Sequence, residues 1–191
     1  MRRTANPSPG FTLVELMIAV LVLAVIATFA VTPLRDFFDR GKVRGAADDL
    51  VSTISQTRAE AVKHGIDARL HFTADAGDWC AGAQSPDAPS GGAAAGNPVE
   101  CNCLTDAPAC TIAGQTYKVM SDDHPDVAIG ALPTSMIFDS NLGVLVPLGA
   151  RQVTLTSPTG KYDVRVQINA LGQAHACTPP TKPTMSSLPS C

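Results

Sequence analysis

The chain has 191 residues, which is enough for one domain of ordinary size and an additional segment. Its formal charge is −3, from 14 Lys and Arg against 17 Asp and Glu, and 45% of its residues are hydrophobic. This composition excludes a wholly disordered chain and a basic nucleic-acid binder, and a mean hydropathy of +0.13 excludes a membrane protein with several spans. The average conceals a division, because residues 11–33 hold 18 hydrophobic residues out of 23 and a single charge, Glu15.

The N-terminal segment joins a short basic stretch to a long apolar run. Residues 1–10 include two arginines, and the run extends from Leu13 to Val31. A secretory signal peptide has a shorter apolar region that is followed by a small-residue cleavage site, whereas about 20 apolar residues can span a bilayer. Positive charges before the run favour a cytoplasmic N-terminus and an exported C-terminal part. These features predict a retained spanning helix over residues 11–33.

A second helix is predicted directly after the apolar run. Pro33 is expected to end or kink the first helix, because proline lacks an N–H group. Residues 34–64 then repeat apolar residues at helical spacing, which is typical of a helix packed on its own domain. Gly65 is placed to end this helix in the left-handed conformation. The predicted buried stripe consists of Val43, Ala47, Leu50, Ile54, Thr57 and Ala61.

Beyond residue 65 the hydrophobic period changes to two, which indicates strands with one buried face. The clearest strands are residues 66–72, 153–156 and 164–169. Weaker candidates are residues 115–120, 134–138 and 143–147, and a short last strand is expected to end near Cys177. One long helix followed by mostly antiparallel strands predicts an α+β fold.

Two further segments carry no helix or strand signal. Residues 74–114 are rich in Gly, Pro and Ala and are predicted to form a long loop, a kind of connection that is often functional. Residues 178–191 contain four prolines in fourteen residues and are interpreted as an extended tail.

The start of the apolar run carries a recognisable motif. The string Gly10-Phe11-Thr12-Leu13-Val14-Glu15-Leu16 resembles the prepilin signature of type IV pilins and type II secretion pseudopilins. The resemblance implies that a prepilin peptidase cleaves between Gly10 and Phe11 and that the new N-terminus at Phe11 is methylated. It also implies that Glu15 forms an intersubunit salt bridge with the N-terminal ammonium of a neighbouring subunit in a filament. Pairing would offset much of the cost of burying both charges.

Later residues narrow the resemblance to the GspH/FimT group of minor pilins and pseudopilins. Arg58-Ala59-Glu60-Ala61-Val62 before a strand, and the late pattern of Val166 to Asn169, Gly172 and Cys177, resemble that group. The resemblance implies a type IV pilin-like fold, in which a long N-terminal helix with a membrane-embedded first half packs on a C-terminal antiparallel sheet domain. The expected division is a leader peptide (1–10), a transmembrane or filament-core helix (11–33), an amphipathic helix (34–65), a β-sheet head (66–177) with the long loop 74–114, and a Pro-rich tail (178–191).

The six cysteines all lie in the exported part of the predicted protein. An even number of cysteines in such a domain favours disulfides. A Cys177–Cys191 bond would tie down the tail, and the other four cysteines would then hold the long loop. A metal site remains an alternative, because Cys101-Asn102-Cys103 brings two thiols close together. The disulfide candidates are Cys80, Cys101, Cys103, Cys110, Cys177 and Cys191.

No other cluster indicates catalysis. Asp122-Asp123-His124 is interpreted as a solvated turn before Pro125, and no Gly-x-Ser-x-Gly elbow or phosphate-binding glycine loop is present. The sequence therefore predicts neither an enzyme nor a bound cofactor or metal. Some FimT relatives bind DNA through a basic Gly-Arg-x-Arg stretch, but the corresponding residues here are Gly172-Gln173-Ala174-His175, so nucleic acid is not an expected partner.

The function that follows from the resemblance is that of a minor pilin. It would be stored in the bacterial inner membrane with its C-terminal domain in the periplasm, and then incorporated into a type IV pilus to prime assembly or to form part of the tip. The implied partners are other minor and major pilins or pseudopilins, the prepilin peptidase, an inner-membrane assembly platform and, before assembly, membrane lipid. A type II secretion pseudopilin and a DNA-binding pilin for natural transformation are the alternatives.

Overall fold

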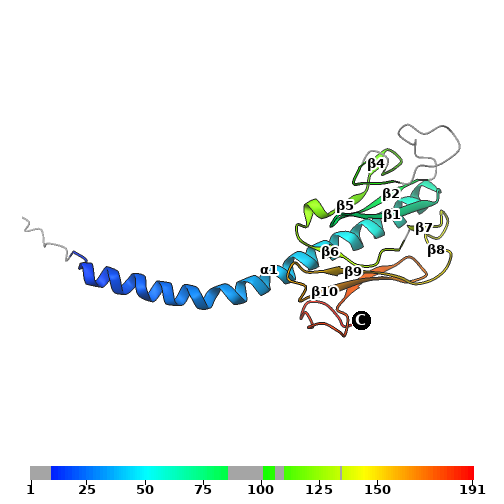
Figure 1. Cartoon of the computed structure of the whole chain (residues 1–191). Coiled ribbons are helices and arrows are strands. Elements are labelled where there is room, and N and C mark those ends of the chain that lie inside the picture. Colours follow the sequence, from blue (N-terminus) through cyan, green and yellow to red (C-terminus); the bar gives the residue numbers. More distant parts are fainter. Residues whose placement is uncertain (1–9, 86–100, 106–109, 134) are drawn as a thin grey trace, which may run out of the picture. The chain divides into compact units, whose positions relative to one another are not determined.

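The structure is a computed structural model that describes residues 10–85, 101–105, 110–133 and 135–191 (Figure 1). The side chains of residues 29–33 lie outside this description, as do the predicted leader residues 1–9 and much of the predicted long loop. The chain divides into two compact units, Met1–Phe38 and Asp39–Cys191. The second unit is called the head below.

Both units share a single helix, α1, which runs from Leu13 to His64 without interruption. Of the two predicted outcomes, an end or a kink at Pro33, the end is therefore wrong. Proline removes only its own N–H from the hydrogen-bond ladder, and the apolar and amphipathic sequences on either side of it both favour the helix. Gly65 ends α1 with a φ of +63°, as predicted for a left-handed cap.

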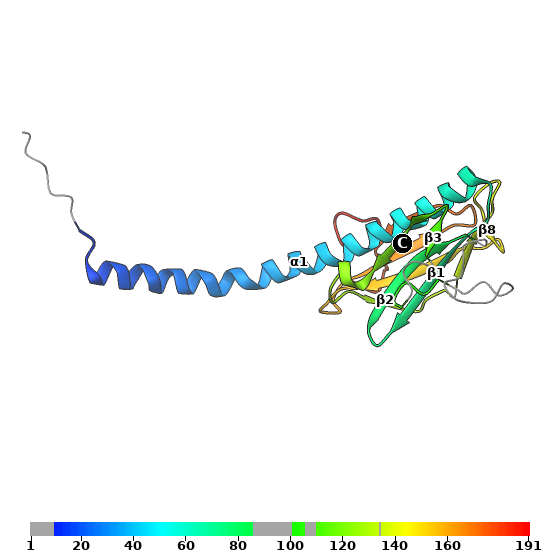
Figure 2. The same cartoon turned by 90° about the horizontal axis from the view of Figure 1, so that it is seen from above.

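The C-terminal half of α1 supplies one side of the head's core. The six residues of the predicted stripe, which include Leu50 and Ile54, are all fully buried. They pack with apolar side chains from the strands, among them Trp79 and Phe138. Figure 2 shows strands β1 and β2 on one side of this part of the helix. The head is thus held together by one continuous hydrophobic core.

Two antiparallel sheets make up most of the described part of the head. The first has the order β5-β2-β1-β7-β8, the second has the order β11-β10-β9-β6, and β3 pairs with β4. The backbone N–H of Leu145 in β8 donates to the carbonyl of Ala170 at 3.0 Å, which joins the first sheet to the turn between β10 and β11. This arrangement confirms the predicted α+β fold. The strands are β1 (Ala68–Asp75), β2 (Asp78–Gln84), β3 (Thr111–Ile112), β4 (Gln115–Thr116), β5 (Lys118–Met120), β6 (Ala128–Ile129), β7 (Ser135–Phe138), β8 (Leu145–Val146), β9 (Arg151–Thr156), β10 (Asp163–Ile168) and β11 (Ala174–Cys177).

The predicted loop 74–114 is shorter than expected, because its first part is a strand. Residues 78–84 form β2, which pairs along its whole length with β1. After Asp78, every residue of β2 is buried. A strand that is buried on both faces does not alternate between apolar and polar residues, so a search for period two does not detect it. Residues 86–100 and 106–109 of the predicted loop lie outside the described residues.

The interpretation of residues 178–191 as an extended tail is also wrong. The segment folds back as a closed loop, with a Cys177–Cys191 disulfide and a bridge between Thr178 and Ser190. Met185 is 2% exposed and belongs to the core of the head. The Lys182 ammonium donates to the carbonyl of Gly160 at 2.6 Å. The loop is therefore part of the packed head.

Candidate functional site

The predicted processing motif lies at the start of α1. Gly10 and Phe11 precede the helix, and the Phe11 side chain is 81% exposed. A Cβ atom at Gly10 would meet no heavy atom within 4 Å. Packing within the described chain therefore gives no reason for a glycine at this position.

Thr12 begins the helix and was not singled out by the sequence analysis. Its hydroxyl oxygen accepts a hydrogen bond from the backbone N–H of Glu15 at 3.3 Å, and its carbonyl accepts the N–H of Leu16 at 3.2 Å. A threonine three residues before a glutamate is the usual sequence signal for such a cap. Glu15 thus occupies the first turn of α1, where the helix dipole favours a negative charge.

The residues that follow the motif expose an apolar surface. The large hydrophobic side chains from Phe11 to Ile26 are between 48% and 81% exposed. They occur at nearly every position, so they surround the helix instead of forming one stripe. A helix that is apolar all round is normally buried, either in a membrane or among other helices. Within the part of the chain whose side chains are described, no helix reaches the length and apolarity required to cross a membrane.

A second group of motif residues meets at the C-terminal end of α1. The Arg58 guanidinium donates from Nε to the carbonyl of Gly143 at 2.9 Å. A Cβ atom at Gly172 would collide with that same carbonyl oxygen and with the Arg58 side chain. Two turns far apart in sequence therefore pack against one arginine of the helix. Arg58 and Gly172 belong to separate parts of the motif in the sequence, and only the fold brings them together.

The turn that contains Gly143 is stabilised by hydrogen bonds between its own residues. The Asp139 carboxylate accepts the backbone N–H groups of Asn141 and Leu142, each at 2.9 Å. These hydrogen bonds, from Leu142 first and Asn141 second, lower the pKa of Asp139 below its ordinary value. The turn presents Leu142 with its side chain 70% exposed. The result is a fixed apolar projection on the surface of the head.

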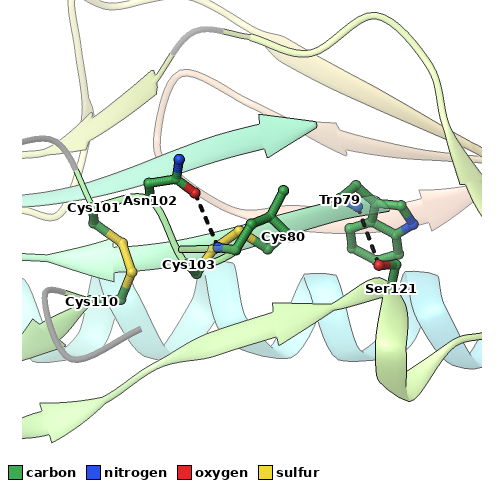
Figure 3. Close-up of a disulfide and its surroundings, with 8 residues drawn as sticks. Trp79, Cys80, Cys101, Asn102, Cys103, Cys110 and Ser121 are labelled. Atoms are coloured by element: carbon green, nitrogen blue, oxygen red, sulfur yellow. Dashed lines mark hydrogen bonds between the residues drawn. A yellow bond between two sulfur atoms is a disulfide. The ribbon is translucent and has the colours of Figure 1, made fainter. Parts of the chain in front are cut away.

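The cysteines form three disulfides, and all six lie in the described ranges. Figure 3 shows the Cys80–Cys103 and Cys101–Cys110 bonds close together. The third bond, Cys177–Cys191, is the pairing that the sequence analysis favoured. The Cys80–Cys103 bond attaches the segment after residue 100 to strand β2, and the Cys101–Cys110 bond joins that segment to the residue before β3.

Strand β2 accommodates these sulfurs through a glycine. A Cβ atom at Gly82 would lie 2.7 Å from the Sγ atoms of both Cys101 and Cys110, so only a residue without a side chain fits there. The Sγ atoms of Cys101, Cys103 and Cys110 lie within 4.8 Å of one another, which is close enough to hold a metal ion. Thiolates, and not disulfides, ligate metals. The metal alternative would therefore require the reduced protein.

The segment Asp122-Asp123-His124 agrees only in part with its interpretation as a solvated turn. The two aspartates are exposed in a short 3₁₀ helix, Ser121–Asp123. The His124 ring instead stacks on Trp79 with centroids 6.4 Å apart, and its Nε2 lies 3.0 Å from a carboxylate oxygen of Asp49. The Ser121 hydroxyl accepts the backbone N–H of Trp79 (Figure 3). These contacts attach the segment to the core, which is a structural role.

Comparisons with known proteins place this architecture in a family. A long helix whose C-terminal half packs on antiparallel sheets defines a pilin-like protein. The model of the family described as type II transport protein GspH matches residues 46–172, about two thirds of the sequence, and the chain belongs to that family. The model described as the prokaryotic N-terminal methylation motif matches residues 6–31, a range that includes Gly10, Phe11 and Glu15.

Two solved structures are also similar to the chain, and both are of the type IV minor pilin FimU from Pseudomonas aeruginosa. In one crystal form the similarity covers 73% of this chain and 90% of FimU, with 16% identity and a TM-score of 0.46. In the other it covers 70% and 90%, with 17% identity and a TM-score of 0.45. No curated protein matches the sequence.

Proposed function

We propose that this protein is a minor pilin, which a prepilin peptidase processes and which is then incorporated into a type IV pilus. The observation that carries the proposal is the contrast within α1. One face of its C-terminal half is covered by the strands of the head, while the apolar side chains of residues 11–26 are exposed on all sides. Exposed apolar surface of this extent needs a partner. Lipid before assembly and the helices of other subunits afterwards would supply that partner.

Cleavage after Gly10 and methylation of Phe11 are the proposed processing steps. The fold itself does not require a glycine at position 10, since a Cβ atom there would meet nothing within 4 Å. A requirement for a small residue at position 10 would then come from a binding partner. The active site of a peptidase that cleaves after this residue would impose such a requirement. Phe11 is exposed immediately before the first helical turn, so its backbone is accessible for cleavage and methylation.

Glu15 is proposed to pair with the N-terminal ammonium of a neighbouring subunit. Glu15 is exposed, and no ion pair among the described residues involves it. A carboxylate buried without a partner in an apolar helix bundle is costly, and an ammonium opposite it offsets much of that cost. The salt bridge would therefore form in the filament and would fix the relative position of adjacent helices.

The remaining proposals concern location and partners. Before assembly the protein would be a single-pass protein of the bacterial inner membrane with a periplasmic head, as the disulfides favour. An inner-membrane assembly platform would extract it, and the head would contact other minor and major pilins. Priming of assembly or a place at the pilus tip is the role that we propose.

A pseudopilin of a type II secretion system is the second candidate, because the matching family is described as a type II transport protein. Deletion of the gene distinguishes the two. We expect loss of surface pili with normal export of secreted enzymes, and restoration of pili by the intact gene. Loss of enzyme export with normal pili would favour the pseudopilin.

Mass spectrometry of the assembled protein tests the processing steps. We expect a chain that begins at methylated Phe11. Gly10→Leu should leave residues 1–10 attached, whereas Gly41→Leu, at an open position of α1, should be processed normally. Filaments that contain the protein with residues 1–10 intact would contradict the proposal.

A further inference from the structure

A cluster of exposed side chains follows the apolar run within the first unit. Leu34, Phe37 and Phe38 are 55%, 71% and 57% exposed. Their spacing of three and four residues places them on one face of α1. The two phenyl rings meet edge to face with centroids 6.0 Å apart. Arg35 is exposed beside them, so the cluster combines aromatic surface with a positive charge.

The position of this cluster along the helix matches the thickness of a bilayer. Residues 16–34 carry no charged side chain. At 1.5 Å per residue these 19 residues extend about 29 Å, and the hydrocarbon core of a bilayer is about 30 Å thick. Glu15 and Arg35 therefore lie at the two ends of an uncharged segment of bilayer length. Leu34, Phe37 and Phe38 begin where that segment ends.

The chemistry of the cluster fits the polar headgroup layer. Helices at a membrane interface bury Phe and Leu side chains at the boundary between headgroups and acyl chains, and arginine guanidinium groups pair with phosphate. We propose that Leu34, Arg35, Phe37 and Phe38 form an interfacial anchor that contacts the lipid headgroups on the head side of the membrane before assembly. This inference rests on the proposed function, because it requires the membrane-stored form.

The anchor would fix the depth of the helix in the membrane. With Phe37 and Phe38 at the interface, the head begins directly outside the bilayer at Asp39. Glu15 would then lie at the opposite interface, where its carboxylate stays hydrated until a neighbouring subunit replaces the water. The same anchor would have to leave the lipid when the subunit is extracted.

Depth-dependent fluorescence quenching tests this anchor. The full chain is reconstituted in vesicles of phosphatidylglycerol and phosphatidylethanolamine whose acyl chains are brominated either near the headgroup or near the bilayer centre. Phe38→Trp reports on the anchor, Leu21→Trp on the middle of the apolar run, and Leu148→Trp on an exposed position of the head. The only native tryptophan, Trp79, is fully buried in the head and supplies a background signal that lipid should not quench.

We expect shallow bromines to quench Phe38→Trp at least twofold more than deep bromines do, and the reverse order for Leu21→Trp. Leu148→Trp should resemble the unsubstituted protein. Quenching of Leu21→Trp without quenching of Phe38→Trp would overturn the anchor and leave the membrane-stored pilin intact. Deep quenching of Phe38→Trp would also overturn it. Absence of quenching at both positions would contradict the membrane-stored form itself.

Discussion

The two halves of α1 differ in apolar content and have opposite surroundings. Leu50, in the C-terminal half, is fully buried among the strands, whereas Leu21, in the N-terminal half, is 65% exposed. Both are leucines in the same uninterrupted helix. Residues 11–26 are apolar at nearly every position, while the C-terminal half concentrates its apolar residues in one stripe.

This contrast indicates that one half of the helix serves folding of the head and the other half serves assembly. A one-sided stripe can be covered by a sheet of the same chain, because a sheet presents one face to it. A helix that is apolar on all sides cannot be covered by a single sheet and needs lipid or several other helices. The C-terminal half therefore stabilises the head, and the N-terminal half is available for partners.

The largest expected effect concerns the N-terminal half alone. Glu15→Ala should reduce incorporation into filaments by tenfold or more, because removing one partner of a buried ion pair costs about 3–5 kcal/mol. The measurement is the amount of the variant in sheared filaments relative to the amount in membranes. Thr12→Ala is the control, since it removes the hydroxyl that caps α1 but keeps the carboxylate.

Comparing Thr12→Ala with Glu15→Ala distinguishes a role of the charge from a role of the helix cap. Equal losses for Thr12→Ala and Glu15→Ala would show that helix capping, and not the charge, is required. Normal incorporation of Glu15→Ala would remove the salt bridge from the proposal. Trp79 fluorescence should be unchanged in both variants, since the head does not depend on these residues.

A second substitution compares the two halves directly. Leu50→Ala should lower the free energy of unfolding of the head by about 2–5 kcal/mol, because it leaves a cavity in the core. Leu21→Ala should leave it unchanged, since Leu21 does not belong to the core of the head. Urea unfolding of the detergent-solubilised protein, followed by Trp79 fluorescence, measures both. Equal destabilisation by the two variants would contradict the division of α1.

Two glycines of the head allow a matched comparison in which the expected change in stability is smaller. Gly65 and Gly172 both have positive φ values, +63° and +76°. Alanine in this conformation costs about 1–2 kcal/mol at either site, but only at Gly172 would the new Cβ also collide with Gly143 and Arg58. Gly172→Ala should therefore destabilise the head by about 1–3 kcal/mol more than Gly65→Ala does. Equal urea midpoints for the two variants would contradict the close approach of the two turns.

The smallest effect concerns the pH dependence of the head. The pKa of Asp139 is lowered by backbone hydrogen bonds, so the folded state favours the ionised carboxylate. Its contribution to stability is therefore present above the ordinary pKa of an aspartate and is lost as the pH falls through the lowered value. NMR titration should show Asp139 ionising below the usual range. Asp139→Asn should remove this part of the acid dependence and leave stability at neutral pH slightly lower.

Local patterns in the sequence predicted much of the head. The stripe around Leu50 and the cap at Gly65 follow from helical spacing and from the backbone freedom of glycine. The alternating strands around Leu70 and Val166 follow from period two, since apolar and polar residues alternate along both. Each of these features depends on residues close together in the chain.

Other features of the head depend on contacts with segments that are distant in the sequence, and no local sequence pattern predicts such contacts. Strand β2 was missed because both of its faces are covered. The sequence predicted the Cys177–Cys191 bond but not the packing of Met185 into the core, because that packing depends on where the strands lie. The contact among Arg58, Gly143 and Gly172 brings together three segments that are more than 25 residues apart in the sequence.

The sequence by itself determined the division of this protein into an apolar N-terminal helix and an acidic head with cysteines. It also determined the motif from Gly10 to Glu15, because both features consist of neighbouring residue types that act through hydrophobicity and charge. Only the tertiary structure decided that β2 completes the sheet, that Met185 packs into the core of the head, and that the turns of Gly143 and Gly172 meet at Arg58. These outcomes depend on contacts between distant segments, whose free energy exists only once the chain has folded.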